Sequence, residues 1–139
     1  MFVGTFEHSL DDKGRVVLPS TFRSHLAARG FLSKLDGCLG LWTPEEFEKV
    51  AELIRDRVRE GRVAPDALRV FAADAAEVKP DSQGRISIPQ RLRDFAGLER
   101  ELIVNGRLDR IEIWDVDRWN RVADTADQNL AAAVVDLGI

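Results

Sequence analysis

A thirteen-residue segment that occurs twice is the feature of this chain that most constrains its fold. Residues 11–23 read DDKGRVVLPSTFR, and residues 81–93 read DSQGRISIPQRLR. Both copies keep an aspartate, a glycine, two arginines and a proline at the same positions, and Gly14 in the first copy corresponds to Gly84 in the second. Half of a 139-residue chain buries too little surface to be comfortably stable alone. The repeat therefore predicts two related halves that pack against each other or against other chains.

Each copy has the pattern of a tight turn followed by a strand and a short helix. The D-x-x-G segment suits a type I turn closed by a left-handed glycine, a common hairpin connection, and the aspartate can accept bonds from nearby backbone N–H groups. The segments RVVLP and RISIP are rich in strand-forming residues, with Ile86 and Ile88 on one face of the second. Pro19 and Pro89 end the strands and are placed to begin helices, the second of which ends at Gly97.

The similarity between the halves continues as far as a tryptophan that ends a strand in each. GLW ends at Trp42 and IEIW ends at Trp114, and the loops before them differ slightly in length between the two halves. After the first tryptophan, Thr43, Pro44 and Glu46 form a capping box that predicts the start of a helix. Apolar residues then recur at helical spacing until the next glycine.

The remaining segments complete a two-repeat organisation. A second helix is predicted to begin at Pro65, and a final helix over residues 117–135 has apolar side chains along one side. The predicted division is a first repeat at 5–47, a helical connector at 48–75, a second repeat at 76–119 and a C-terminal helix at 120–139.

The charge of the chain argues at first against a nucleic-acid partner. The formal net charge is −4 and the sequence pI is about 5.2. Residues 109–139 hold seven acids and three arginines, however, so the part of the chain before Asp109 is neutral overall. Within residues 81–93, three arginines stand against one aspartate. The distribution of charge therefore leaves a nucleic-acid function open.

Other features of the sequence indicate in which cellular compartment the chain is expected. No run of about 18 apolar residues exists to span a membrane, and the N-terminus lacks the basic and apolar segments of a secretory signal. The single cysteine, Cys38, cannot form an internal disulfide, so a reducing cytoplasm is the expected setting.

The sequence provides little support for catalysis. His8 and His25 have no spacing that pairs them with a nucleophile or an acid, and Cys38 lies in an apolar context typical of a small buried residue. A metal site would need all three residues to converge without any short-range ligand pair. Phosphate-binding glycine loops are absent. We therefore expect no enzyme activity, no metal and no cofactor.

The repeated arginines have two interpretations. Arg15 could pair with Asp11 four residues earlier, and such an exposed pair contributes only about 0–1 kcal/mol. Duplication explains repeated core residues, but it does not require an exposed turn to keep the same long side chain. Arg15 and Arg85 lie beside the turns, where a fork of N–H donors could meet phosphate or guanine.

Three segments resemble those of the MraZ family of bacterial transcription factors, and the similarity covers essentially the whole chain: MFVGTFEHSLDDKGRVVLPSTFR, DSQGRISIPQRLRDFAGL and IEIWDVDRW. The resemblance implies an α+β, β-rich fold. Two pseudo-symmetric SpoVT/AbrB-like swapped-hairpin repeats would form a β-barrel-like core, with helices between and after them.

The resemblance also implies a function. Members of this family form a ring-shaped homo-oligomer, often an octamer, that binds double-stranded DNA at short direct repeats upstream of its own operon. That operon is the division and cell-wall gene cluster, which the family commonly represses, so the implied location is the cytoplasm in association with the nucleoid.

The DNA-binding residues implied by the resemblance and the turn chemistry lie on the two turns and the helix that follows: Asp11, Lys13, Gly14, Arg15, Arg23, Asp81, Gly84 and Arg85. Arg15, with Lys13 beside it, is the expected principal contact. Gln83 replaces the lysine in the second copy, so the second turn is expected to bind more weakly. Arg23 and Arg93 could reach phosphate or pair with a local acid.

A function of another class stays open. AbrB-like folds also serve as protein-binding modules, such as antitoxins that hold a toxin through an extended segment. Antitoxin relatives tend to have a single repeat and a disordered tail, whereas the tail of this chain has a helical apolar stripe. A purely structural assembly is a further alternative.

Overall fold

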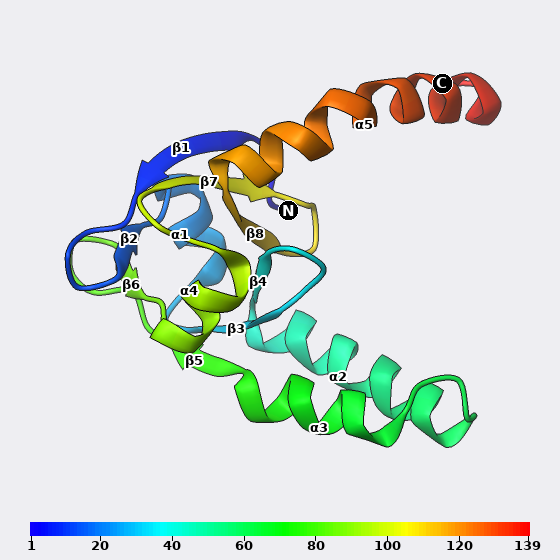
Figure 1. Cartoon of the computed structure of the whole chain (residues 1–139), viewed down its shortest axis with the longest axis horizontal. Helices are drawn as coiled ribbons and strands as arrows, with labels where there is room; N and C mark the ends of the chain where they lie inside the picture. The colour runs from blue at the N-terminus through cyan, green and yellow to red at the C-terminus, as the bar shows by residue number, and fades with distance from the viewer.

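The two halves of the chain contain the same elements in the same order (Figure 1). The computed structural model describes all residues, Met1–Ile139. The first half contains β1 (Thr5–Ser9), β2 (Arg15–Val17), α1 (Ser20–Leu26), β3 (Gly30–Lys34), β4 (Leu39–Trp42) and α2 (Pro44–Arg59). Helix α3 (Pro65–Asp74) follows, and the second half contains β5 (Ala76–Val78), β6 (Arg85–Ser87), α4 (Gln90–Ala96), β7 (Glu101–Gly106), β8 (Ile111–Asp115) and α5 (Val116–Leu137).

The first two strands of each repeat pair with the other repeat. Strand β1 pairs with β7, β5 pairs with β3 and β2 pairs with β6, all antiparallel. The third and fourth strands pair within each repeat, and β4 pairs with β8 to join the halves. The result is a six-stranded sheet in the order β1-β7-β8-β4-β3-β5, accompanied by a two-stranded β2–β6 ribbon.

The strand register reveals a pseudo-twofold relation between the repeats. Val16 lies opposite Ile86, its counterpart in the duplicated segment, in the centre of the β2–β6 ribbon. Gly40 lies opposite Glu112 in the centre of the β4–β8 pair, and these two residues correspond when Trp42 is aligned with Trp114. The resemblance to a β-rich α+β fold with two swapped repeats is therefore confirmed.

The prediction that the D-x-x-G turn joins two paired strands of one hairpin is wrong. The turn itself closes, because the Gly14 N–H donates to the Asp11 carbonyl at 3.0 Å and the Asp11 N–H donates to the Arg15 carbonyl at 2.9 Å. Beyond the turn, β1 and β2 belong to different ladders. The reason is burial: crossing to the other repeat lets β2 and β6 place their central apolar side chains against a shared core.

The core draws on both repeats at equivalent positions. Nineteen buried apolar residues form one cluster. The duplicated segment supplies matched sets to it, and Ile86 and Ile88 share one buried face as predicted. The matched residues are Val16, Leu18, Phe22 and Leu26 in the first copy, and Ile86, Ile88, Leu92 and Ala96 in the second. Burial of apolar surface between the halves is the main force that holds them together.

The helices begin at, or within one residue of, the positions that the sequence predicts. Thr43 Oγ1 accepts the Glu46 N–H at 3.2 Å, which confirms the capping box of α2. Helix α3 begins at Pro65 as predicted and packs against α2, where the Phe47 ring stacks between those of Phe31 and Phe71. The short helices α1 and α4 begin one residue after their prolines, which act as N-caps instead of first helical residues.

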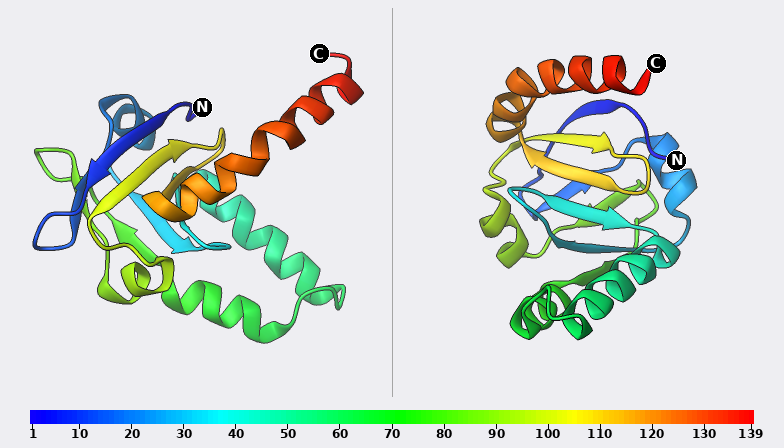
Figure 2. Two further views of the ribbon diagram at one scale, coloured as in Figure 1. Left: turned by 45° about the horizontal axis from the view of Figure 1, so that its top comes forward. Right: turned by 90° about the vertical axis from the view of Figure 1, so that its right-hand side faces the viewer.

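Helix α5 extends well beyond the sheet. It begins at Val116, where Asp115 Oδ2 accepts the Arg118 N–H at 3.1 Å, and it continues to Leu137. Figure 2 shows its C-terminal half projecting away from the strands, while α2 and α3 lie on the opposite side of the sheet. The two repeated turns lie at the other end of the molecule (Figure 1). No helix combines the length and the apolar character that crossing a membrane requires.

Replacement of Trp42 by alanine tests this account of the core. The Trp42 side chain is 0% exposed, so we expect Trp42→Ala to lower the free energy of unfolding by about 3–5 kcal/mol. Urea titration followed by circular dichroism at a fixed protein concentration measures the change. Leu53→Ala, at a position that is 51% exposed on α2, is the control and should change stability little. Equal stability of the Trp42→Ala variant and the native protein would contradict the assignment.

Candidate nucleic-acid interface

The carboxylate of Asp11 holds the first repeated turn together. Its Oδ1 accepts the backbone N–H groups of Lys13 and Arg15, both at 2.9 Å, and its Oδ2 accepts Nε of the Arg15 guanidinium at 2.7 Å. One side chain therefore satisfies two backbone donors and also orients the arginine. The local sequence explains this arrangement, because an aspartate at the start of a turn readily accepts bonds from the residues two to four positions later.

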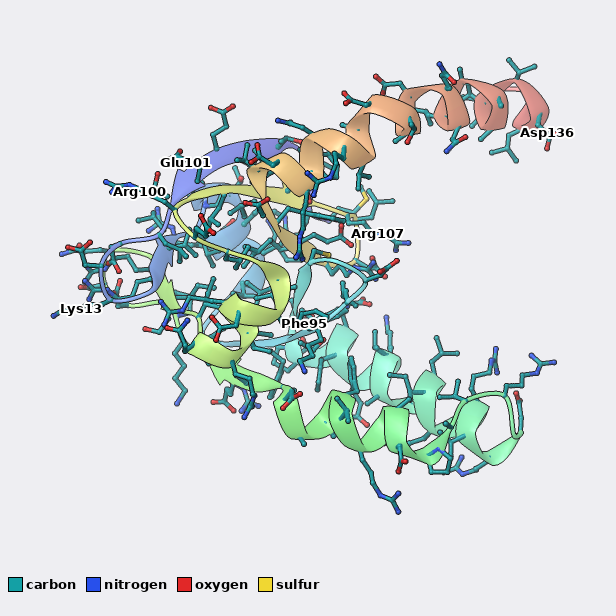
Figure 3. The ribbon with its side chains drawn as sticks, in the orientation of Figure 1. Lys13, Phe95, Arg100, Glu101, Arg107 and Asp136 are labelled. Carbon is teal, nitrogen blue, oxygen red and sulfur yellow. The ribbon has the colours of Figure 1, made fainter.

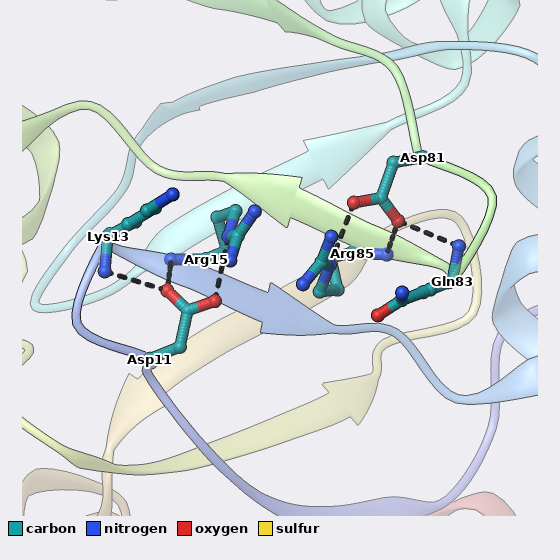
Figure 4. Close-up of polar contacts among 6 residues, drawn as sticks. All are labelled: Asp11, Lys13, Arg15, Asp81, Gln83 and Arg85. Atoms are coloured by element: carbon teal, nitrogen blue, oxygen red, sulfur yellow. Dashed lines mark hydrogen bonds and ion pairs between the residues drawn. The ribbon is translucent and has the colours of Figure 1, made fainter.

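The second turn repeats the same arrangement. Asp81 Oδ1 accepts the N–H groups of Gln83 and Arg85 at 2.9 Å, and its Oδ2 accepts Nε of Arg85 at 2.8 Å. Figure 4 shows the two Asp–Arg pairs side by side on one face of the β2–β6 ribbon. The ribbon therefore carries two nearly identical guanidinium groups in a fixed relative position.

The Asp–Arg pairs leave the outer edge of each guanidinium free. Arg15 and Arg85 use only Nε for their aspartates, and their Nη groups donate to no other group in the chain. The two side chains are 26% and 25% exposed. A guanidinium that is bound on one edge and open on the other can still donate two parallel hydrogen bonds to an acceptor pair, such as a phosphate or the N7 and O6 atoms of guanine.

Both turn aspartates are more acidic than usual. The backbone hydrogen bond from Arg15 is the largest cause that holds the pKa of Asp11 below its ordinary value of 3.8, and the Arg15 side chain adds to it. The same bonds from Arg85 lower the pKa of Asp81. The carboxylates stay ionised where they are needed as acceptors, so the arginine orientation persists throughout the neutral pH range.

An arginine of the opposite repeat lies against the glycine of each turn. Gly14 and Gly84 have φ angles of +75° and +78°, a region that favours glycine. A Cβ on Gly14 would also displace the Arg93 guanidinium, and one on Gly84 would displace that of Arg23. Both glycines are buried, so they shape the turns and do not form their outer surface.

Of the two alternatives considered for Arg23 and Arg93, the pairing with a local acid is wrong, and contact with phosphate stays a prediction. Neither forms an ion pair with an acid, and the Nε atom of each is buried without a hydrogen-bond partner. Their guanidinium groups lie across the ribbon against the opposite turn glycines. Arg23 and Arg93 follow their turns at the same spacing in both copies, which indicated that they are important. What they contact could not be predicted, because each lies against the turn of the opposite repeat.

The outermost side chains distinguish the two turns. Lys13 and Gln83 occupy equivalent positions and are exposed, and only their backbone N–H groups bond to the turn aspartates. Lys13 lies at the extreme end of the molecule, far from Asp136 on α5 (Figure 3). The first turn, with Lys13 at its tip, and the acidic C-terminal helix are thus at opposite ends.

Each residue considered for catalysis has a different environment in the structure. Cys38 packs with Ile103 and Trp114, and burial raises the pKa of its thiol to about 12. Burial lowers the pKa of His8, and His25 bonds through Nδ1 to the Thr21 carbonyl within its own helix. No group of three or more His, Cys, Asp or Glu side chains is arranged to hold a metal ion.

Comparison with known proteins gives a consistent result. The family model described as "MraZ protein, putative antitoxin-like" matches residues 1–63 and 71–136. A transcriptional regulator MraZ of Paenarthrobacter aurescens is 41% identical over 139 residues, covering 94% of this chain and 97% of that protein. The proteins of the same name from Kocuria rhizophila and Halothermothrix orenii are 45% and 37% identical, covering 87% and 100% of this chain and 85% and 100% of theirs.

The acidity of the turn aspartates can be tested directly. We expect the Asp11 carboxyl carbon, followed by NMR during an acid titration, to show a midpoint below 3.8. In Arg15→Ala the midpoint should rise, because the guanidinium that favours the ionised form is gone. A lowered pKa stabilises the folded turn above the unfolded pKa, and this contribution disappears as the pH falls through the folded pKa. An Asp11 midpoint unaffected by Arg15→Ala would show that the pair does not form in solution.

Proposed function

The chain belongs to the MraZ family, and from this premise we propose that it is a transcription regulator that binds double-stranded DNA through its two Asp–Arg turns. The relatives named as transcriptional regulators support the general role. The specific proposal depends on one observation: two oriented guanidinium groups with free outer edges lie together on one exposed ribbon.

Pre-orientation makes the two arginines suitable for reading DNA. A free arginine loses side-chain entropy when it binds, whereas Arg15 and Arg85 are already held by their aspartates. A good bidentate contact between arginine and guanine discriminates against a wrong base by about 1–3 kcal/mol. The arrangement would therefore convert a small contact area into base specificity.

The overall negative charge is compatible with this proposal because of where the charges lie. Helix α5 carries the acids Asp117, Asp124, Asp127 and Asp136, and it extends from the end of the molecule opposite to the turns. DNA bound at the turns would lie at the end of the molecule opposite to most of this charge. Salt at physiological concentration largely screens exposed charges that are farther apart than the Debye length of about 8 Å. A single chain with few cations would still bind weakly.

We propose that assembly into a ring-shaped homo-oligomer compensates for weak individual binding. Helix α5 exposes Leu130 and Leu137, which lie seven positions apart on one face, and an unpartnered apolar surface of this kind is typical of a contact between subunits. Several turns in one assembly act at high effective concentration once the first is bound. Direct repeats with matching spacing would then be selected by geometry as well as by base contacts.

The finer parts of the proposal follow from the family resemblance. The proposed target is a set of direct repeats upstream of the protein's own operon, in the division and cell-wall gene cluster, with repression as the outcome. The proposed location is the cytoplasm, in association with the nucleoid. The proposed division of labour assigns DNA contact to the repeats at 5–47 and 76–119, and leaves the segments 48–75 and 120–139 for contacts between subunits.

Removal of the Arg15 guanidinium tests DNA binding. We expect Arg15→Ala to abolish the gel shift of DNA from the region upstream of the gene, while the melting temperature and oligomer mass stay unchanged. Arg85→Ala should weaken binding less, because Lys13 has no counterpart beside Arg85. The control is Arg69→Ala, which removes the same charge from an exposed position on α3.

Three outcomes would contradict the proposal at different points. Unaltered affinity of the Arg15→Ala variant would refute the role of the first turn. A larger loss for Arg85→Ala than for Arg15→Ala would show that the two turns have reversed roles. Failure of the native protein to shift this DNA without a partner would favour the alternative of an antitoxin-like protein-binding module, which the family description mentions.

Introduction of a negative charge on the apolar face of helix α5 tests whether this face forms a contact between subunits. Leu130 is 61% exposed within one chain, so Leu130→Asp should leave the fold of the subunit intact but reduce the oligomer mass measured by light scattering. Binding to DNA with several repeats should weaken with it, because fewer turns act together. Asn129→Asp adds the same charge at the adjacent position, on the side of α5 that faces Gly37 and Trp114, and is the matched control. An unchanged mass for Leu130→Asp would exclude this helix face from the interface.

A further inference from the structure

We infer that each chain reads an asymmetric DNA site, with guanine beneath the Lys13 turn and adenine beneath the Gln83 turn. The inference rests on the proposed function, because it assumes that both turns contact DNA. It goes further in assigning the direction in which a chain lies on its site and the two side chains that determine this direction.

The β2–β6 ribbon by itself has no direction. Val16 and Ile86 face each other at its centre, so the pseudo-twofold relation exchanges β2 with β6 and the first turn with the second. A ribbon with two identical turns would fit a palindromic site, because protein symmetry and site symmetry correspond. Direction therefore has to come from residues at which the two turns differ.

The supporting framework does not provide such a difference. The bonds from the backbone N–H groups to the aspartates have the same length in both turns, and the bonds from the arginine Nε atoms measure 2.7 Å and 2.8 Å. Each turn glycine is backed by the guanidinium of the opposite repeat. Arg15 and Arg85 are therefore presented in the same way, and both would seek the same kind of acceptor.

The exposed side chains at the turn tips do provide a difference. The sequence between aspartate and glycine is Asp12–Lys13 in the first turn and Ser82–Gln83 in the second. The Lys13 ammonium and the Gln83 side-chain amide form no hydrogen bond within the chain, and Figure 4 shows them at opposite ends of the ribbon. They are free to contact a ligand at the two ends of one site.

The chemistry of these two groups predicts different bases. A lysine ammonium only donates hydrogen bonds, which suits the N7 and O6 acceptors of guanine as well as phosphate. A glutamine amide both donates and accepts, which matches N7 and N6 of adenine in the major groove. The negative charge of Asp12 offsets that of Lys13, so both turns carry the same net charge and differ in the hydrogen-bonding groups at their tips.

Selection of binding sites tests this inference. A duplex library with a randomised central region is enriched for binding to the native protein and to three variants, Gln83→Lys, Lys13→Gln and Lys49→Gln. The substituted positions are exposed or lie on the surface of α2, so circular dichroism should report the same fold for all four proteins. Lys49→Gln is the matched control, because it makes the same chemical change away from the turns.

The expected result is a change in site symmetry. The native protein and Lys49→Gln should enrich an asymmetric unit with guanine at one end and adenine at the other. Gln83→Lys should enrich a palindromic unit with guanine at both ends, and it should bind that unit at least tenfold more tightly than the native protein does. Lys13→Gln should replace the base that Lys13 contacts, guanine, by adenine, and should leave the bases that Arg15 contacts unchanged.

The opposing results separate this inference from the proposed function. Enrichment of a palindromic unit by the native protein, or of one and the same unit by the native protein and Gln83→Lys, would overturn the inference and leave DNA binding in place. Enrichment of no sequence by the native protein would overturn the proposed function, and the inference with it.

Discussion

The antiparallel pairing of β2 with β6 is the contact on which both the fold and the candidate site depend. Each strand comes from a different repeat, so neither half can bury Val16 or Ile86 without the other. The same pairing brings the two repeated turns to one end of the molecule and to one face (Figures 1 and 4). Core formation and assembly of the site are therefore a single event, and a folded chain necessarily presents both arginines together.

Each turn depends on three groups that act at different distances along the chain. The aspartate is local and satisfies backbone N–H groups, and the glycine is local and adopts a positive φ. The third group, the arginine that lies against that glycine, comes from the opposite repeat. Each turn therefore contacts a side chain from the other half of the chain, and the same contact occurs at both turns.

The pseudo-symmetry is broken where packing or exposure allows it. Glu112 is buried and accepts hydrogen bonds from Trp114 Nε1 at 3.1 Å and from Arg110. Its counterpart, Gly40, has no side chain because the Trp42 ring occupies the space, and Trp42 Nε1 has no partner. Helix α3 similarly covers α2 but has no counterpart on α5. The repeats therefore share a framework but differ in individual side chains and in the helices that cover them.

The sequence by itself determined the local features: the duplication, the turns, the buried faces of the strands, the Thr43 cap and the pairing of Asp11 with Arg15. The duplication is visible when the two halves of the chain are compared, and the other features depend on residues within about five positions of one another, so patterns in the chain reveal them. Only the tertiary structure decided which strands pair. The turn pattern alone suggested ordinary hairpins, whereas the family resemblance implied the exchange between repeats that the structure has. It also assigned Arg23 and Arg93 to the opposite turns. Contacts between residues in opposite halves of the chain are selected by burial of the whole apolar surface, which no local pattern encodes.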